Sequence, residues 1–421
     1  MTTYQLAQLF LTLAIIIVLA RVFGAVARRL GQPAVLGELT AGILAGPTLL
    51  SADIRGMLFP ASIGTALAAL ANVALVLFMF CVGLELDQSL LKGRGRVAVA
   101  VSVGSIVVPF GLAVGPALWM AGNHGVSDRL PFVLFIGAAM SVTAFPVLAR
   151  ILTDRKMNRL EIGGLALASA AVDDVVAWGM LAFVTAIGGY AAGGQWEVTL
   201  VVPYVLLMVL VVRPLLRKAC TVDGRPRPLT PGLLSLVLAG LLLSSYATER
   251  IGIHFIFGAF LYGAMMPKQG FAEFRRVLVE RIEPVSGTIL LPVFFVISGM
   301  RVDLSSVGTQ GLAELAVILA VAVGGKFGGA YLCARSAGLG GRQSGTLASL
   351  MNTRGLTEIV FLTVGLQHSI IDRDLFSLMV VMAIVTTAMA GPLLHWFYPR
   401  RLVERDLAAV TPEPVLAAAA K

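Results

Sequence analysis

Long apolar runs recur along the chain, separated by short clusters of Gly, Pro and charged residues. A helix that spans a membrane needs about 20 mostly apolar residues. The pattern predicts an all-α, polytopic membrane protein, with a polar loop at 268–283 and a disordered tail at 400–421. About 13 segments qualify as spanning helices: 5–27, 33–50, 63–86, 97–121, 131–152, 160–188, 197–217, 229–248, 253–267, 284–303, 311–334, 343–369 and 374–398.

Composition favours a membrane protein over the other classes. Of the 421 residues, 58% are hydrophobic and only 13% are charged, whereas soluble domains carry about 25% charged residues. Disordered chains are polar and highly charged, so disorder of the whole chain is excluded as well. The three cysteines lie far apart, and no P-loop or dinucleotide-binding fingerprint occurs. The chain is therefore not expected to be an enzyme or to hold a cofactor.

The net charge of +9 could indicate binding to nucleic acid. The Lys and Arg residues, however, alternate between connections: 25 of the 32 fall in every second connection or in the C-terminal tail, and five fall in the others. Cytoplasmic connections of membrane proteins are enriched in these cations. The distribution predicts that the N-terminus lies outside and the C-terminus in the cytoplasm, and it argues against a nucleic-acid partner. Only Lys326 and Arg354 remain inside apolar segments.

A weak internal repeat relates the two halves of the chain. The third segment ends in a Phe-containing run with Gly83 and Asp87, and the tenth ends in a similar run with Gly299 and Asp303, at an offset of 216 residues. Because an odd number of segments separates the partners, the halves are expected to be inverted in the membrane. Two inverted five-helix repeats, segments 2–6 and 9–13, follow a common plan of secondary transporters.

Charged side chains at membrane depth mark functional sites, because each costs about 2.5–3.5 kcal/mol to insert. Asp173 and Asp174 lie near the middle of the sixth segment. Adjacent residues on a helix point about 100° apart, so one carboxylate can face a cavity while the other faces a neighbouring helix. Closely spaced buried carboxylates favour a bound proton or a hard cation. The pair is the candidate site for a monovalent cation and a proton.

Lys326 lies in the middle of the eleventh segment, where a buried ammonium needs a partner. Asp173 or Asp174 is the expected partner. The alternative is a side chain that extends to the membrane surface.

Two further segments are interrupted by polar residues. The fifth contains Ser141, Thr143 and Pro146, and the twelfth contains Arg354 and Glu358. They hold corresponding positions in the two repeats, which is the best sequence pointer to a transporter site. Freed carbonyls and hydroxyls can bind a cation there, while Arg354 and Glu358 balance the half-helix dipoles. A simple proline kink with an Arg354–Glu358 pair is the alternative interpretation.

The remaining charged candidates are less specific. Glu38, near the cytoplasmic end of the second segment, either lines an ion funnel or forms a structural pair. Glu314 is expected to be structural. The four histidines lie at loops or helix ends and are interpreted as ordinary interface residues, although a pH-sensing role is possible.

Together these residues resemble the monovalent cation:proton antiporters of the sodium/proton exchanger superfamily, on the bacterial cation:proton antiporter-2 branch that includes potassium efflux systems. The resemblance covers about residues 5–398. The Asp-Asp pair and the Arg-Gly-Leu-Thr-Glu sequence are specific in combination. The matching stretches are 37–47, 77–87, 141–148, 168–178, 258–267, 292–303, the Lys326 segment and 351–361.

The resemblance implies the sodium/proton antiporter fold, in which the two broken segments cross beside the Asp pair. It also implies a homodimer in the plasma membrane of a bacterium. The implied units are a dimerisation scaffold (1–96 and 229–305), an ion-carrying core (97–190 and 306–399), a linker helix with a cytoplasmic loop (191–228) and the tail (400–421).

The resemblance further implies that Asp174 is the ion ligand, that Asp173 pairs with Lys326, and that the core moves like an elevator against the scaffold. We therefore expect exchange of Na⁺ or K⁺ for H⁺, with Thr143 and Ser141 completing the oxygen shell. A channel-like K⁺ efflux protein and an exporter of a small organic product are the alternatives. The chain shows no C-terminal nucleotide-binding regulatory domain of the kind found in potassium efflux members, so gating by nucleotide or glutathione is not expected.

Overall fold

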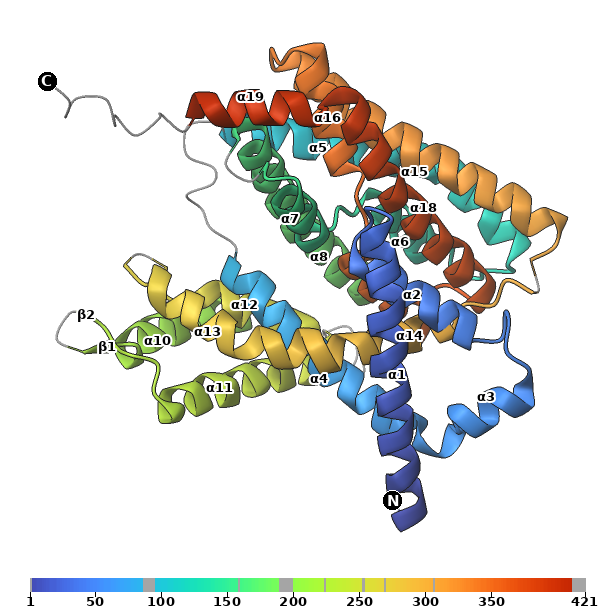
Figure 1. Ribbon diagram of the computed structural model, residues 1–421, viewed down its shortest axis with the longest axis horizontal. Helices are drawn as coiled ribbons and strands as arrows, with labels where there is room; N and C mark the ends of the chain where they lie inside the picture. The colour runs from blue at the N-terminus through green and yellow to red at the C-terminus, as the bar shows by residue number, and fades with distance from the viewer. Residues whose placement is uncertain are drawn as a thin grey trace, which may run out of the picture.

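The computed structural model describes residues 2–85, 95–157, 160–188, 200–222, 225–251, 254–268, 270–305 and 307–410, most of them in helices (Figure 1). Some residues used in the sequence analysis lie outside these ranges. They are Asp87 of the repeat, four of the counted cations (Lys92, Arg94, Arg159 and Lys421), the ends of three predicted segments (86, 197–199 and 253) and residues 411–421 of the tail.

The described residues of the first half form these helices: α1 (Thr3–Arg29), α2 (Ala34–Ala45), α3 (Ala52–Leu58), the 3₁₀ turn η1 (Ala61–Ile63), α4 (Gly64–Glu85), α5 (Gly95–Asn123), α6 (Arg129–Ser141), α7 (Phe145–Asp154), α8 (Glu161–Ile187), α9 (Val201–Leu207) and, after the π-helical turn η4 (Met208–Val212), α10 (Arg213–Ala219). Two short strands, β1 (Thr221–Val222) and β2 (Arg225–Pro226), pair antiparallel.

The described residues of the second half form helices without strands: α11 (Pro231–Arg250), α12 (Phe255–Met265), α13 (Ala272–Val285), the π-helical turn η5 (Ser286–Leu290), α14 (Leu291–Met300), α15 (Thr309–Ser336), α16 (Gly341–Met351), α17 (Leu356–Gln367), α18 (Arg373–Phe397) and α19 (Arg400–Val410).

Length and composition confirm a polytopic helical membrane protein. Within the described residues, nine helices are long and apolar enough to cross a membrane, and α2, α12 and α17 are shorter apolar helices. Large apolar side chains such as Phe10, Leu243 and Leu332 are exposed on the outer faces of these helices. Exposure of this kind is expected where a helix faces lipid, because its backbone groups are already satisfied internally.

The predicted loop at 268–283 is wrong, because most of it is the helix α13, which continues through η5 into α14. Phe274, Leu278 and Ile282 recur every four residues and are buried. Glu273 and Arg276 lie on the exposed side, where they form an ion pair. The mean hydropathy of this stretch is low, because the charged residues on one face of the helix offset the apolar residues on the other. A search for apolar runs therefore misses the helix.

The tail is also more ordered than its composition predicts, because residues 400–410 form α19. Val403 is buried on this helix, and the Tyr398 hydroxyl donates a hydrogen bond to Asp406. The apolar side chains therefore hold one face of α19 against the end of α18. Figure 1 shows α19 lying across the ends of the longer helices.

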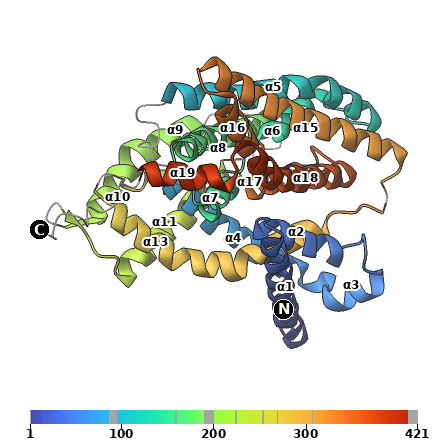
Figure 2. The same cartoon turned by 45° about the horizontal axis from the view of Figure 1, so that its top comes forward.

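The long helices form two groups, which lie one above the other in both views (Figures 1 and 2). The crossing bundle consists of α5–α8 and α15–α18, and its most extensive contact joins α5 to α15. The flanking bundle consists of α1–α4 and α11–α14, and its main contacts pair α2 with α14 and α4 with α12. The segment α9–α10 links the two.

Glycines set the spacing inside the flanking bundle. A Cβ on Gly42 of α2 would lie 2.3 Å from the Val296 carbonyl oxygen of α14, and a Cβ on Gly83 of α4 would lie 2.2 Å from the Phe260 carbonyl oxygen of α12. Small residues at such crossings let helix backbones touch, which is how helices commonly associate in membranes.

Candidate functional site: two broken helices and a buried carboxylate pair

The fifth and twelfth predicted segments are both broken, as the sequence predicts. Residues 142–144 separate α6 from α7, and residues 352–355 separate α16 from α17. The breaks touch each other, because the Ala144 N–H donates to the Thr353 carbonyl oxygen at 3.0 Å. Pro146 lies in the first turn of α7, where a proline removes no helical hydrogen bond. It therefore begins a helix instead of kinking one.

Close packing fixes this crossing point. A Cβ on Gly355 would lie 2.5 Å from Val147 Cγ2 of α7. The Thr143 hydroxyl also reaches across, to the Met351 carbonyl oxygen at 3.2 Å. The ends of the four half-helices α6, α7, α16 and α17 therefore meet in the interior of the crossing bundle.

Asp173 of α8 is surrounded by donors. Its carboxylate accepts hydrogen bonds from Ser102 Oγ (2.5 Å) and Ser105 Oγ (2.9 Å) of α5 and from Thr143 Oγ1 (2.5 Å). Lys326 Nζ of α15 lies 3.4 Å away, and both charged side chains are fully buried. The structure thus joins Asp173, Thr143 and Lys326, which the sequence analysis singled out, and adds two serines that it missed.

Lys326 reaches this position because α5 and α15 pack closely. A Cβ on Gly325 would lie 2.8 Å from Pro109 Cα, and one on Gly329 would lie 2.2 Å from the Gly104 carbonyl oxygen. Lys326 Nζ donates to the Ser141 carbonyl oxygen at 2.5 Å and to the Ser105 carbonyl oxygen at 3.3 Å. A buried ammonium with these partners does not extend to the membrane surface.

Arg354 and Glu358 form the predicted pair, at 2.9 Å, with both side chains fully buried. Arg354 also donates to the carbonyl oxygens of Ala139 (2.8 Å) and Met140 in the last turn of α6. Arg354 and Lys326 therefore both donate to carbonyl oxygens at the C-terminal end of α6, where the helix dipole is negative. Glu358 lies in the first turn of α17, where the dipole is positive.

Asp174 differs from its neighbour, although each residue is only 1% exposed. Within the described part of the chain, neither carboxylate oxygen of Asp174 has a hydrogen-bond partner. The backbone N–H of Phe145 faces this carboxylate from outside hydrogen-bonding geometry. The positive end of α7 therefore lies beside a buried, unpartnered acid. Such a group can take a proton or a small cation with a preference for oxygen ligands.

Two other candidates are placed elsewhere. The Ser141 hydroxyl is directed at the carbonyl oxygens of Ile106 and Gly137, so only its own carbonyl group takes part in the cluster. Glu38 is half-buried on α2 and interacts electrostatically with Arg21 and Arg28 of α1. The structure does not bring Glu38 to the Asp pair.

The sequence analysis missed Ser102 and Ser105 as site residues and gave Asn352 no role. The only signal for the serines is their spacing of three residues on one face of α5, which is common in membrane helices. Asn352 ends α16 at the break, is fully buried, and has no partner for either amide atom among the described residues.

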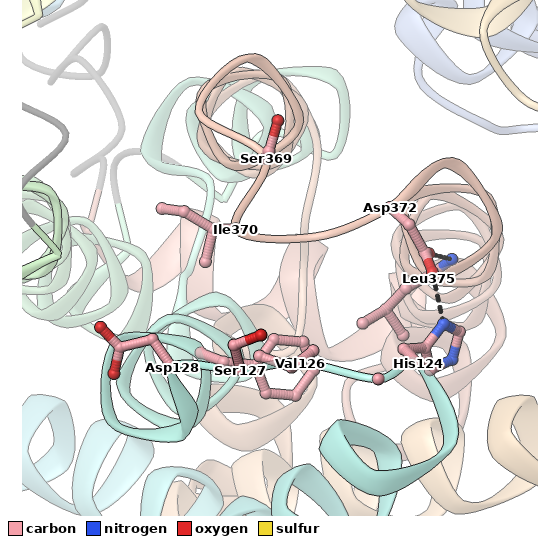
Figure 3. A pocket seen from close by; sticks show the side chains of 10 residues that line it. His124, Val126, Ser127, Asp128, Ser369, Ile370, Asp372 and Leu375 are labelled. Atoms are coloured by element: carbon pink, nitrogen blue, oxygen red, sulfur yellow. Dashed lines mark hydrogen bonds and ion pairs between the residues drawn. The ribbon is translucent and has the colours of Figure 1, made fainter.

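A second charged cluster lies where α5 ends and α18 begins, at the opposite end of α18 from α19. Figure 3 shows its His124 and Asp372. His124, just beyond α5, bonds Asp372 at 2.5 Å and Glu314 of α15 at 3.0 Å. The hydrogen bond with Asp372, and then that with Glu314, raises the pKa of His124 to about 9 against the cost of burial. Asn123 also donates to Glu314, at 2.7 Å. The group borders a cavity of about 350 Å³ that Ile370 helps to line. That Glu314 has a structural role stays a prediction.

A buried acid pair, a buried lysine and two crossed helix breaks inside a helical membrane protein define a secondary transporter. The sequence profile described as "Sodium/hydrogen exchanger, transmembrane" matches residues 14–399. The chain belongs to this family of monovalent cation:proton antiporters and is not an enzyme. At this level its function is exchange of Na⁺ or K⁺ for protons.

Curated relatives agree in sequence. The chain is 38% identical over 408 residues to the Na⁺/H⁺ antiporter NhaS4 of Synechocystis, covering 95% of this chain and 99% of that protein. It is 36% identical to cation/H⁺ antiporter 17 of Arabidopsis thaliana (94% and 49% covered) and 30% identical to K⁺/H⁺ antiporter 1 of Saccharomyces cerevisiae (87% and 44% covered). The chain thus spans about half the length of the plant and yeast relatives.

The fold agrees with a solved structure. The sodium proton antiporter MjNhaP1 from Methanocaldococcus jannaschii at pH 8 superposes with a TM-score of 0.67, covering 94% of this chain and 99% of that chain. Sequence identity is 17%, so this likeness concerns the fold alone.

Proposed function

We propose that a monovalent cation and a proton bind in turn to Asp174, and that this competition couples their opposite movements. The carrying observation is the contrast inside the acid pair. Asp173 is bonded by Ser102, Ser105, Thr143 and Lys326, whereas Asp174 is equally buried and unpartnered among the described residues.

Burial makes an isolated carboxylate unstable, because water no longer solvates its charge. A proton or a small cation removes this penalty, and one carboxylate cannot serve both productively at once. Thr143 and the unpartnered Asn352 amide, both at the breaks, are suitable sources of further oxygen ligands. We assign Ser141 to anchoring Lys326 through its carbonyl group, because its hydroxyl is engaged elsewhere.

The other charges position this site and do not bind the transported metal cation. Lys326 neutralises Asp173 and holds the end of α6, so that a cation entering beside them meets one free acid. Arg354 and Glu358 neutralise the half-helix ends at the crossing point. If the ion pair between Lys326 and Asp173 separates, Lys326 can also exchange a proton. Two protons would then move for each cation.

For the carrier movement we propose thirteen membrane crossings built as two inverted repeats. The contacts support this symmetry. The first helix of each proposed repeat packs against the second helix of the other repeat: α2 against α14, and α12 against α4. The crossing bundle serves as the transport core. It moves like an elevator against the flanking bundle, which serves as the scaffold and as the contact surface of a homodimer.

Membrane and orientation are part of the same proposal. From the family resemblance we infer a bacterial plasma membrane. From the distribution of Lys and Arg between alternate connections we infer that the N-terminus of α1 lies outside and α19 in the cytoplasm. The transported cation is Na⁺ or K⁺. The names of the cyanobacterial and yeast relatives include one of each.

Proteoliposomes with a trapped pH-sensitive dye test the site. Addition of Na⁺ or K⁺ outside should move protons in the wild type, and Asp174→Asn should abolish this response while leaving the folded protein intact. Asp53→Asn, an exposed acid on α3, is the matched control and should exchange like the wild type. Normal exchange by Asp174→Asn would remove Asp174 from the mechanism. Cation flux without proton movement in the wild type would favour a channel.

A further inference from the structure

A second cavity, of about 1030 Å³, opens where the two bundles meet beside α19. One side is the turn between α1 and α2, at 28–33, and the other sides are the ends of α7 and α18 and the inner face of α19. The bundles are already joined at this place. Gln32 Nε2 donates to the Ala388 carbonyl oxygen at 3.1 Å, and Pro392, four residues further along α18, leaves that carbonyl without a helical donor.

The cavity is strongly cationic. Its lining includes five cationic side chains and two carboxylates: Arg28, Arg150, Arg155, Lys156, Arg400, Asp154 and Glu404. Arg150 pairs with Asp154 at 3.2 Å. Arg155 Nη2 donates to the Gly391 carbonyl oxygen of α18 at 3.0 Å, and burial, followed by the positive charge of Arg400, lowers the pKa of Arg155. Such like charges repel each other until an anion lies between them.

The backbone at Lys156 supports a dedicated role for its side chain. Lys156 has φ 58° and follows the end of α7. The Met157 N–H bonds the Leu152 carbonyl oxygen at 2.8 Å and the Lys156 N–H bonds that of Thr153 at 3.0 Å, as in a Schellman motif. Glycine usually takes this left-handed position, because a Cβ is strained there. In this chain a lysine occupies the position, at the edge of the cavity.

The positive charge of this cavity is explained neither by a role in binding the transported cations nor by the general enrichment of Lys and Arg on the cytoplasmic side alone. Its excess of positive charge repels Na⁺ and K⁺, so it does not suit a cation vestibule. Cytoplasmic enrichment in Lys and Arg accounts for cations on this face, but not for their arrangement around one hollow. Apolar side chains of Ile151, Val403 and Leu407 form another part of the lining. The combination suits an anion with an organic part.

We propose that this cavity binds a phosphate ester, with its phosphate held by Arg155, Lys156 and Arg400 and its organic part against α19. The planar guanidinium groups of arginine match the geometry of phosphate oxygens. The ligand is either the headgroup of an anionic lipid or a soluble phosphate metabolite. Because the cavity is lined by both bundles, a bound phosphate would restrain their relative movement. This restraint rests on the proposed transport mechanism, whereas the binding of the phosphate ester does not.

Phosphate-ester binding is measured without an ion gradient and does not depend on transport. A negative binding result can therefore be told apart from a failure of the transport proposal. In the lipid arm, protein in phosphatidylcholine nanodiscs with and without phosphatidylglycerol is examined by native mass spectrometry. In the soluble arm, glycerol 3-phosphate is titrated by calorimetry against protein in phosphatidylcholine alone. Binding in the first arm identifies a lipid, binding in the second identifies a metabolite, and binding in neither overturns the proposal.

Variants locate the site. Lys156→Gly with Arg400→Gln should weaken binding by about tenfold or more, because each removes a charged hydrogen-bond donor. Glycine suits the backbone at 156, so this variant should fold. Arg29→Gln with Arg401→Gln removes the same charge from exposed neighbours that do not line the cavity, and it should bind within about twofold of the wild type. Equal weakening of both pairs would show that the cations act only as a diffuse surface charge.

Discussion

The crossing bundle and the flanking bundle bury different kinds of polar side chain. In the flanking bundle, the buried polar side chains of the described residues carry hydroxyl groups, such as Ser244 and Thr248, which bond nearby carbonyl oxygens. All fully buried charged side chains of the described residues lie in the crossing bundle: Asp173, Asp174, Glu314, Lys326, Arg354 and Glu358.

This difference separates two structural tasks. Backbone contact at glycines gives the flanking bundle a fixed shape that needs no charge. Buried charges in the crossing bundle are tolerable only while each is neutralised, so their stability depends on what they bind. Five of the six are bonded to or paired with a neighbouring group, and Asp174 is the exception among the described residues. Asp174, the proposed ion site, is therefore the one group of these six described side chains that has no partner.

The largest stability effect is expected for Arg354→Ala in the crossing bundle. It leaves Glu358 buried and unpaired and uncovers two carbonyl groups of α6, which should cost about 3–5 kcal/mol. Thermal unfolding in detergent measures this loss. Arg276→Ala, which breaks an exposed pair of the flanking bundle, is the control and should leave the melting temperature unchanged. Similar melting of both variants would contradict the comparison.

A smaller loss is expected for Gly83→Ala in the flanking bundle. The added Cβ would lie 2.2 Å from the Phe260 carbonyl oxygen, so α4 and α12 must separate, at a cost of about 1–3 kcal/mol. The same melting assay applies. Gly115→Ala on α5 is the control, because nothing lies within 4 Å of its added Cβ. If Gly83→Ala melts like this control, close glycine contact does not fix the bundle.

The smallest effect concerns pH and the His124 cluster. Because the pKa of His124 is raised from 6.5 to about 9 by Asp372 and Glu314, its stabilising charge is fully present below pH 6.5 and is lost as pH rises through 9. His124→Gln should remove this part of the alkaline decline in melting temperature. His395→Gln, at the other end of α18, should retain it. An unchanged alkaline decline in His124→Gln would contradict this assignment.

Much of the crossing bundle could be predicted from sequence, because charged residues are conspicuous in apolar segments. Asp173, Asp174, Lys326 and Arg354 were found in this way, and the Arg354–Glu358 pair followed from its spacing. The breaks followed from polar residues that a lipid-facing helix excludes.

The rest could not be predicted, for physical reasons that differ between residues. Ser102 and Ser105 fit any membrane helix, since a serine hydroxyl can bond its own backbone, so their contact with Asp173 depends on tertiary packing. The choice of Asp173 over Asp174 as the partner of Lys326 depends on the rotation of α8, which the sequence does not specify without a resemblance. Helices α13 and α19 were missed because their charged faces masked short apolar stripes.

The most direct test of the central claim is proton release on cation binding to purified protein. Na⁺ or K⁺ is added to weakly buffered wild type and Asp174→Asn in detergent, without any membrane gradient. If cation and proton compete for Asp174, the wild type releases up to about one proton per chain at a pH where the site is protonated, and Asp174→Asn releases none. Equal release from both proteins would contradict the account.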